Sequence, residues 1–199
     1  HPGIARFIDA GLDAQGSAWL AMEYIDGQSL TEWAQTERPS LPDRLRLFQQ
    51  ICQAVHAAHR QLVIHRDLKP ANVLVDAQGQ AHLLDFGIAK LMDDTQREAT
   101  VTSLTPAYAA PEQLLGEPVG TAADVFALGL LLMQLLSGRL PDDRANLALP
   151  QLVLRAGNPV QQRASELATQ QDLPYPATVL RGDLDAIVAQ ALRIEPEAR

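Results

Sequence analysis

A block of eight residues near the first third of the chain constrains the fold most strongly. Residues 65–72 read His-Arg-Asp-Leu-Lys-Pro-Ala-Asn and run directly into a short β-prone piece, Val73–Val75. A turn at Asp76–Gly79 and a second β-prone piece, His82–Leu84, come next, and then the polar group Asp85-Phe86-Gly87. The spacing predicts a small hairpin. One polar group precedes its first strand and the other follows its second strand, so the two groups of polar side chains should lie close together.

Composition limits the classes of protein that fit. The chain has 199 residues, 47% of them apolar, which is enough for one globular domain with a sizeable core. Acidic residues (24) outnumber basic ones (16) for a net charge of −8, which argues against nucleic acid or an anionic membrane as the main partner. The single cysteine, Cys52, excludes an internal disulfide and fits a reducing compartment. It lies in an apolar helical stretch and is interpreted as a small core residue.

Hydrophobic periodicity predicts a chain that is mainly α-helical. From Asp43 to Ala58 apolar residues form a helical stripe. Ala122–Leu136 is apolar nearly all round, which predicts a buried helix that is too short to cross a bilayer. Further helices are expected near Asn146–Arg155 and over Leu184–Arg193.

The N-terminal part is predicted to be a β-hairpin followed by a helix. Ile4–Ala10 and Ala18–Tyr24 read as strands joined by a turn at Asp13–Ser17. Ser29, with Glu32 three residues later, is a capping box and predicts a helix start. Val63-Ile64, just before the polar block, is a further β-prone piece.

With a third motif, Ala110-Pro111-Glu112, the chain resembles the bacterial eukaryotic-type (Hanks-type) serine/threonine protein kinases. The three motifs stand in the order of the catalytic loop, the metal-binding loop and the end of the activation segment, and the resemblance covers nearly the whole chain. It implies a mainly α fold: the C-terminal lobe of a protein kinase, helical with short β-hairpins at the catalytic and metal-binding loops, plus the last strands of the small lobe. Residues 1–25 would be the end of the small lobe and the hinge, and residues 26–199 the large lobe, truncated before its last helix.

The resemblance assigns catalytic roles to Asp67, Lys69 and Asn72. Phosphoryl transfer needs positioning and charge stabilisation more than covalent chemistry. By resemblance, Asp67 orients and deprotonates the acceptor hydroxyl, Lys69 stabilises the transferring phosphate, and Asn72 and Asp85 bind Mg²⁺ through hard oxygen atoms. The implied cofactors are ATP and Mg²⁺, with Mn²⁺ as a second candidate ion. Without the motif, Asp67 would be a loop cap and Lys69 a solvated surface residue.

The segment Met22–Gly27 resembles the hinge that binds adenine. Adenine recognition there uses unpaired backbone groups, so side chains are loosely specified. The resemblance makes Met22 the gatekeeper and brings the Glu23 carbonyl and the Ile25 amide to the adenine edge. It places Ser29 at the ribose and Leu74 under the base; the capping role of Ser29 is compatible with the ribose contact.

The resemblance also implies regulation and support around the loop. Arg66 precedes Asp67, as in kinases whose activation loop carries a phosphate. Thr105 is similar to the threonine that hydrogen-bonds the catalytic Asp and Lys, although Leu104 stands where the family often has glycine. Asp124 resembles the buried residue that holds the catalytic-loop backbone. The candidate phosphate acceptors are Thr95, Thr100, Thr102 and Ser103, Phe86 would pack on His65, and Glu112 would pair with Arg199.

Several kinase parts do not occur in this sequence. No Gly-x-Gly-x-x-Gly precedes the hinge, and there is no Val-Ala-x-Lys strand or helix with its Glu partner. One hypothesis is a domain cut from a full kinase, inactive alone; the other is a naturally shortened pseudokinase that acts as a scaffold. A small-molecule phosphotransferase is a third class, disfavoured by Thr105 and the 110–112 motif.

The expected partners are ATP and a protein substrate with a Ser or Thr acceptor, with no nucleic acid. In the intact protein, autophosphorylation and dimerisation fit the resemblance. The kinase domain is expected in the cytoplasm, in a parent protein in which a membrane segment outside this chain is compatible with the family. The substrate, the activating signal and the oligomeric state are left open by the sequence.

Overall fold

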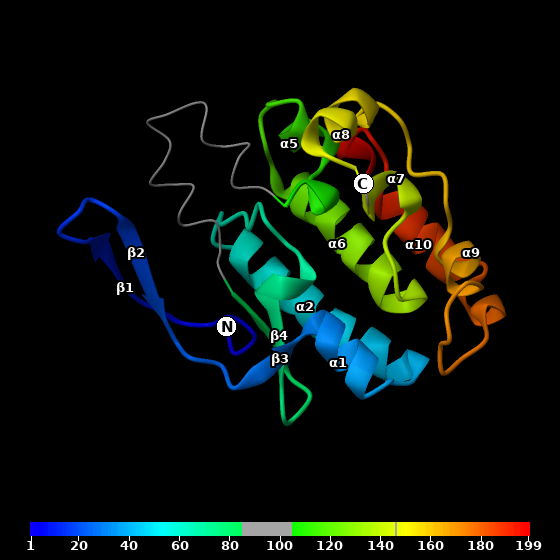
Figure 1. Ribbon diagram of the computed structural model, residues 1–199, viewed down its shortest axis with the longest axis horizontal. Coiled ribbons are helices and arrows are strands. Elements are labelled where there is room, and N and C mark those ends of the chain that lie inside the picture. Colours follow the sequence, from blue (N-terminus) through cyan, green and yellow to red (C-terminus); the bar gives the residue numbers. More distant parts are fainter. Residues whose placement is uncertain (85–104, 146) are drawn as a thin grey trace.

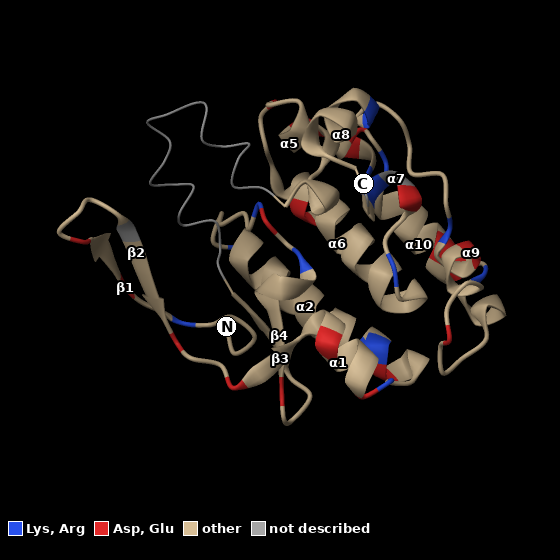
Figure 2. Ribbon diagram, in the orientation of Figure 1, with Lys and Arg blue, Asp and Glu red and all other residues tan. Residues whose placement is uncertain are grey.

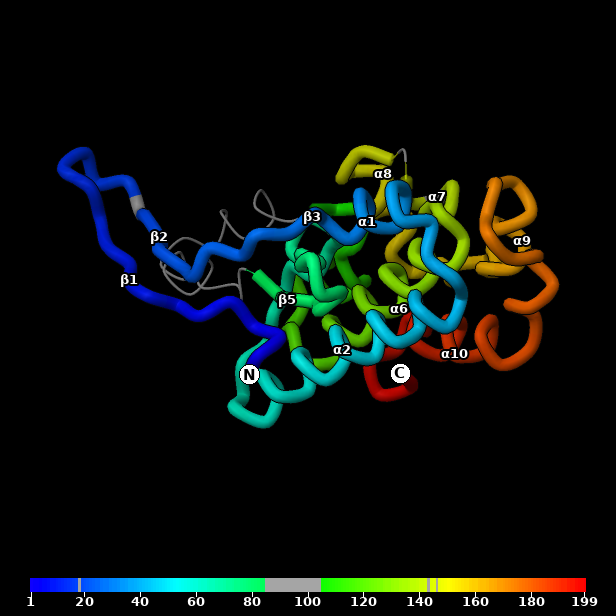
Figure 3. The backbone as a smooth tube through the Cα atoms, turned by 90° about the horizontal axis from the view of Figure 1, so that it is seen from below, coloured from blue at the N-terminus to red at the C-terminus, as the bar shows by residue number. Residues whose placement is uncertain are grey.

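The computed structural model describes residues 1–84, 105–145 and 147–199. Helices dominate, and two small sheets accompany them. The first sheet is an antiparallel hairpin of β1 (Phe7–Leu12) and β2 (Ala18–Met22), which projects away from the helical body (Figures 1 and 3). The Asp13 carboxylate closes its turn by accepting from the amides of Gln15 and Ser17.

The predicted N-terminal hairpin is confirmed with shifted ends. The first strand begins at Phe7 and not at Ile4, because Ile4 forms an isolated bridge with Leu83 and the Ala5 amide donates to the Leu83 carbonyl. The second strand ends at Met22, and residues 23–26 have no regular structure. The chain thus leaves the hairpin through an irregular segment before it joins the main body.

The second sheet holds the polar loop in place. Its strands are β3 (Gly27–Ser29), β4 (Val73–Asp76) and β5 (Ala81–Leu83), antiparallel in the order β3-β4-β5. The predicted hairpin around Asp76–Gly79 is confirmed as β4 and β5, whereas β3 was not predicted. A Cβ on Gly27 would lie 2.6 Å from the Val75 carbonyl oxygen, so only glycine permits this close pairing.

Val63-Ile64 was expected to be β-prone, and this prediction is wrong. The Val63 amide donates to the carbonyl of Ala58 and so ends the preceding helix, with Leu62 in a left-handed conformation (φ 59°). The Val63 amide, which a strand would need for its ladder, is committed to closing that helix.

Two helices follow β3 in the chain and form one side of the body. The helix α1 (Leu30–Thr36) starts at the predicted capping box, with Ser29 accepting from the Glu32 amide and the Glu32 carboxylate accepting from Ser29. The helix α2 (Leu41–His59) is capped by Ser40 and buries Leu47, Ile51 and Val55 against the second sheet and α6.

The helix α6 (Thr121–Ser137) lies at the centre of the fold (Figure 1). Most of its residues are buried, as its apolar sequence predicted, and it separates two core clusters that pack on its opposite sides. Gly138 ends it in the left-handed conformation (φ 79°). Among the described residues no helix is long and apolar enough to cross a membrane.

Short helices complete the far side of α6. They are α5 (Pro111–Leu114), α7 (Asp142–Ala145), α8 (Leu149–Arg155), α9 (Ala164–Ala168) and α10 (Asp183–Ala191). The helix predicted near Asn146–Arg155 starts later, at Leu149, because Pro150 suits a first turn and the Gln151 side chain caps the free Ala148 amide. Single 3₁₀ turns cover Pro70–Asn72, Pro106–Tyr108, Ala177–Leu180 and Pro196–Ala198.

Candidate active site

One buried carboxylate holds the backbone of the loop at residues 65–72. Asp124, near the start of α6, is 1% exposed. Its oxygens accept from the backbone amides of His65 (2.8 Å) and Arg66 (2.9 Å), and His59 Nε2 lies 2.7 Å from the same group. The prediction that Asp124 holds the loop backbone is confirmed, and the His59 contact is an addition to it.

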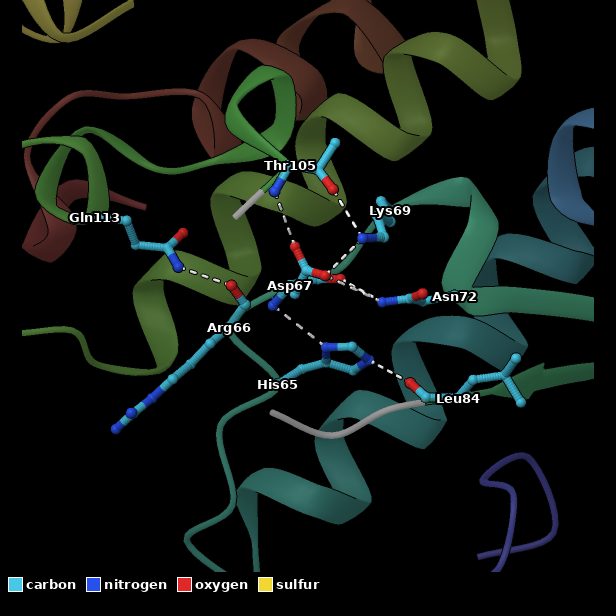
Figure 4. A network of polar contacts seen from close by, with 8 residues as sticks. All are labelled: His65, Arg66, Asp67, Lys69, Asn72, Leu84, Thr105 and Gln113. Atoms are coloured by element: carbon cyan, nitrogen blue, oxygen red, sulfur yellow. Dashed lines mark hydrogen bonds and ion pairs between the residues drawn. The ribbon is translucent and has the colours of Figure 1, made fainter. Parts of the chain in front are cut away.

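The His65 ring joins this loop to the end of β5. Burial is the main cause that lowers the pKa of His65, so the ring is neutral near pH 7. Nε2 lies 2.8 Å from the Leu84 carbonyl, which can only accept, so the proton resides on Nε2. Nδ1 is then the acceptor for the Asp67 amide at 3.4 Å (Figure 4).

Asp67, Lys69 and Asn72 meet in one polar cluster. Lys69 Nζ lies 2.7 Å from Asp67 Oδ2, and Asn72 Nδ2 lies 2.9 Å from the Asp67 carbonyl and 3.4 Å from its Oδ2 (Figure 4). The Asp67 and Lys69 side chains are 17% and 24% exposed, so both remain open to a ligand. The three residues predicted to be catalytic are therefore brought together by the 3₁₀ turn at Pro70–Asn72.

Thr105 completes the cluster from a distant part of the chain. Its hydroxyl lies 2.8 Å from Lys69 Nζ, and its amide donates to Asp67 Oδ1 at 3.3 Å. This contact was predicted for Thr105 and is confirmed. It ties the segment just before α5 to the loop that carries Asp67.

Of the two residues predicted to bind Mg²⁺, Asn72 lies in the described part of the chain. Asn72 is 7% exposed, and its side-chain nitrogen is committed to Asp67, which leaves Oδ1 as the oxygen available to a cation. The Asn72 carbonyl accepts from the Leu84 amide (2.9 Å). Asp85 and Phe86, together with the candidate phosphate acceptors Thr95, Thr100, Thr102 and Ser103, lie outside the described residues. Elsewhere in the described ranges, no group of three or more His, Cys, Asp or Glu side chains could hold a metal ion.

The predicted nucleotide residues are distributed over β2, the segment that follows it, β3 and β4. Met22 ends β2, and the irregular segment 23–26 connects it to β3. Within the described part of the chain, no hydrogen bond engages the Glu23 carbonyl or the Ile25 amide, as an adenine-binding hinge requires. Ser29 on β3 pairs with Leu74 on β4, and Leu74 lies two residues after Asn72. The Ser29 hydroxyl accepts from the Glu32 amide (3.3 Å) and donates to the Glu32 carboxylate (2.8 Å), so its capping role is realised in this structure.

An ion pair fixes α5 to the body. Glu112 accepts from both terminal nitrogens of Arg199, at 2.7 and 2.9 Å, and both side chains are almost fully buried. This pair was predicted and is confirmed. The guanidinium also lies 4.9 Å from the centre of the Phe126 ring.

Besides His59, Gln113 was missed by the predictions from sequence. Gln113, next to Glu112, is 8% exposed and donates from Nε2 to the Arg66 carbonyl at 2.8 Å (Figure 4). The only sequence signal was a glutamine three residues after Ala110, at a helix start, which by itself indicates no more than a cap. Figure 2 shows the basic residues scattered among several elements, in keeping with the net charge of −8.

Comparison with known proteins agrees with these features. A family model described as "Protein kinase domain" matches residues 1–199. Serine/threonine-protein kinase PknB of Mycobacterium tuberculosis (strain H37Ra) is 34% identical over 209 aligned positions, covering all of this chain and 31% of the relative. Serine/threonine-protein kinase pkn2 of Myxococcus xanthus is 42% identical over 151 positions, covering 72% of this chain and 18% of the relative.

The chain thus spans less than a third of the length of these relatives. Its match to the family model nevertheless runs from the first residue to the last. The polar cluster at Asp67 and the buried supports around it lie within that match. On this evidence the chain belongs to the protein kinase family and is related to bacterial serine/threonine kinases.

Proposed function

We propose that the protein is an ATP-dependent serine/threonine protein kinase, which transfers the γ-phosphate of Mg-ATP to Ser or Thr hydroxyls of a protein. The observation that carries the proposal is the cluster of Asp67, Lys69 and Asn72, joined by Thr105. Its carboxylate, ammonium and amide groups are those that phosphoryl transfer to a hydroxyl requires.

Asp67 is suited to bind and deprotonate the acceptor. A carboxylate has about four lone-pair sites. Donors from Lys69, Asn72 and Thr105 contact its oxygens, two of them at long distances of 3.3 and 3.4 Å. A further lone pair can therefore accept the proton of a substrate hydroxyl, which makes Asp67 the general base of the proposed reaction.

Lys69 is suited to hold the transferring phosphoryl group. An ammonium group has three N–H donors, and Lys69 directs two of them at Asp67 and Thr105. The third is left for a phosphate oxygen, to which it offers a charge-assisted hydrogen bond. Thr105 keeps Lys69 beside Asp67, so the base and the positive charge stay at a fixed separation.

Asn72 fits a magnesium ion through its side-chain oxygen, and Asp85 is proposed as the second ligand on the sequence alone. When bound, the metal ion neutralises charge on the phosphate oxygens. The free Glu23 carbonyl and Ile25 amide are proposed to receive adenine, with Met22, Ser29 and Leu74 around the nucleotide.

The proposal extends to the architecture. Residues 1–25 are assigned to the end of a small lobe and the hinge, and residues 26–199 to a large lobe. The division is supported by the hairpin of β1 and β2, whose strands pair with one another, and by β3, which joins the sheet of the body. Exposed apolar side chains on the hairpin suit a surface that further kinase sequence would cover, among them Phe7, Ile8 and Leu12.

The test uses the protein at its full encoded length, assayed for transfer of labelled phosphate from ATP to itself and to a generic basic protein. Asp67→Asn should lower the rate by about 10²–10⁴-fold, the usual contribution of a general base. Asp183→Asn, which makes the same change at an exposed position, should keep the parent rate. An Asp67→Asn protein as active as the parent would contradict the role of Asp67. A folded parent that transfers no phosphate would favour the scaffold alternative.

A further inference from the structure

The backbone of Arg66 has an unusual conformation, and hydrogen bonds hold the peptide groups on both sides of it. Arg66 has a left-handed backbone (φ 65°), which residues other than glycine rarely adopt. Such a conformation persists only where the surroundings enforce it. Arg66 immediately precedes Asp67, so its conformation sets the direction in which the Asp67 carboxylate leaves the loop.

Two side chains enforce this conformation from opposite ends of the residue. Asp124 Oδ1 accepts from the Arg66 amide at 2.9 Å, and Gln113 Nε2 donates to the Arg66 carbonyl at 2.8 Å. The Arg66 carbonyl and the Asp67 amide belong to one peptide group. The Asp67 amide faces His65 Nδ1 at 3.4 Å, so Gln113 and His65 hold the two edges of that peptide.

Gln113 is itself fixed in one orientation. Its Oε1 accepts from the Ala110 amide at 3.0 Å, and its Nε2 donates to the Arg66 carbonyl. An amide N–H can only donate and a carbonyl can only accept, so the reversed side-chain amide would lose both contacts. The side chain is 8% exposed, and water offers little replacement for either bond.

We propose that Gln113 is a positioning residue that sets the placement of Asp67 by holding the Arg66 carbonyl. The inference rests on the proposed kinase function and adds a physical link between α5 and the loop. It acts together with Thr105, which reaches Asp67 and Lys69 from the same stretch of chain. A displacement of α5 would therefore release the Arg66–Asp67 peptide as well as the contacts of Thr105.

A capping role for Gln113 makes a different prediction, and two substitutions separate the two roles. Gln113→Glu keeps an oxygen for the Ala110 amide but, when ionised, cannot donate to the Arg66 carbonyl. Gln113→Met is similar in length and loses both bonds. Gln151 provides a matched control, because its Oε1 caps the Ala148 amide of α8 in the same way (2.9 Å) at an exposed position.

The experiment measures kcat and the KM for ATP across pH 5.5–8.5 in the full-length protein, with parent, Asp67→Asn, Gln113→Glu, Gln113→Met and Gln151→Glu. At pH 8 we expect both Gln113 variants to lose kcat by about 10- to 100-fold, as for a misplaced catalytic group, with the KM for ATP within about twofold of the parent. The deficit of Gln113→Glu should shrink toward low pH, because the protonated carboxyl regains a donor. Gln113→Met should show no such recovery, and Gln151→Glu should match the parent.

The outcomes keep this inference apart from the proposed function. If Asp67→Asn is inactive while both Gln113 variants retain the parent kcat, the positioning role is overturned and the kinase function stands. If Gln113→Glu keeps the melting temperature and kcat of the parent at every pH while Gln113→Met loses both, Gln113 is a helix cap only and the proposal also fails. An Asp67→Asn protein as active as the parent would overturn the proposed function itself. If Gln113→Glu does not fold, the parent kcat in folded Gln113→Met overturns the positioning role, and a loss of kcat at an unchanged melting temperature supports it.

Discussion

At the residue scale, the cluster around Asp67 shows which contacts a sequence can reveal. Asp67, Lys69 and Asn72 lie within six positions of one another, so a single turn brings them together and the motif alone predicted their meeting. Gln113 reaches the same loop from α5, and His59, at the end of α2, contacts the Asp124 carboxylate that holds the loop. Their contribution depends on how α5 and α2 dock, which no local pattern in the sequence encodes.

The buried ion pair of Glu112 and Arg199 belongs to the same scale. Arg199 also donates to the carbonyls of Ala122 (3.0 Å) and Ile194 (2.7 Å), so its charge is well satisfied in the folded protein. Removing one partner of such a pair leaves the other charge buried without compensation. Glu112 lies between Pro111 and Gln113 on α5, so the pair also fixes the position of the proposed positioning residue.

We expect Glu112→Ala to lower the free energy of unfolding by about 3–5 kcal/mol, because Arg199 would remain buried and unpaired. Glu117→Ala removes an exposed carboxylate a few residues away and should change it by less than about 0.5 kcal/mol. Denaturant titration of the full-length protein measures both. Coinciding transitions for Glu112→Ala and the parent would show that the pair contributes no net stability.

At the scale of elements, the packing of α6 against α10 shows where periodicity ceases to be informative. The apolar pattern predicted both helices and the burial of α6, but it gave no reason for Gly129 in the middle of the helix. A Cβ at Gly129 would lie 2.9 Å from the Ala191 Cβ and 2.9 Å from Leu192 Cδ2. The glycine is therefore required by the close approach of α10, at the expense of intrinsic helix stability.

Gly129→Ala tests this packing. Helix propensity alone would favour alanine by about 1 kcal/mol. We expect a net loss of about 1–3 kcal/mol, because the added methyl group forces α10 outward. Gly157→Ala, at a position with nothing within 4 Å of an added Cβ, is the matched control and should leave stability near that of the parent. A more stable Gly129→Ala protein in thermal unfolding would refute the close packing.

At the scale of the whole molecule, the order of elements could be predicted better than their ends. The N-terminal hairpin, the β4–β5 hairpin and the long helices were expected from pattern and turn residues. The strand at Val63-Ile64 was not formed, since the Val63 amide closes α2 instead. The pairing of β3 with β4 was not foreseen, because three residues carry too little pattern to identify a strand. That pairing places Ser29 opposite Leu74, two residues from Asn72 of the candidate active site.

We expect Asp67 and Lys69 to act as one unit in the proposed reaction, since a 2.7 Å ion pair joins them and Thr105 contacts both. The most direct measurement is kcat for phosphate transfer by the full-length protein in Asp67→Asn, Lys69→Ala and the double variant. Residues that work as a unit give losses that do not multiply. The double variant should therefore be about as slow as the slower single variant, with each single variant at least about 10²-fold below the parent. Losses that multiply, or a single variant with the parent rate, would contradict the account.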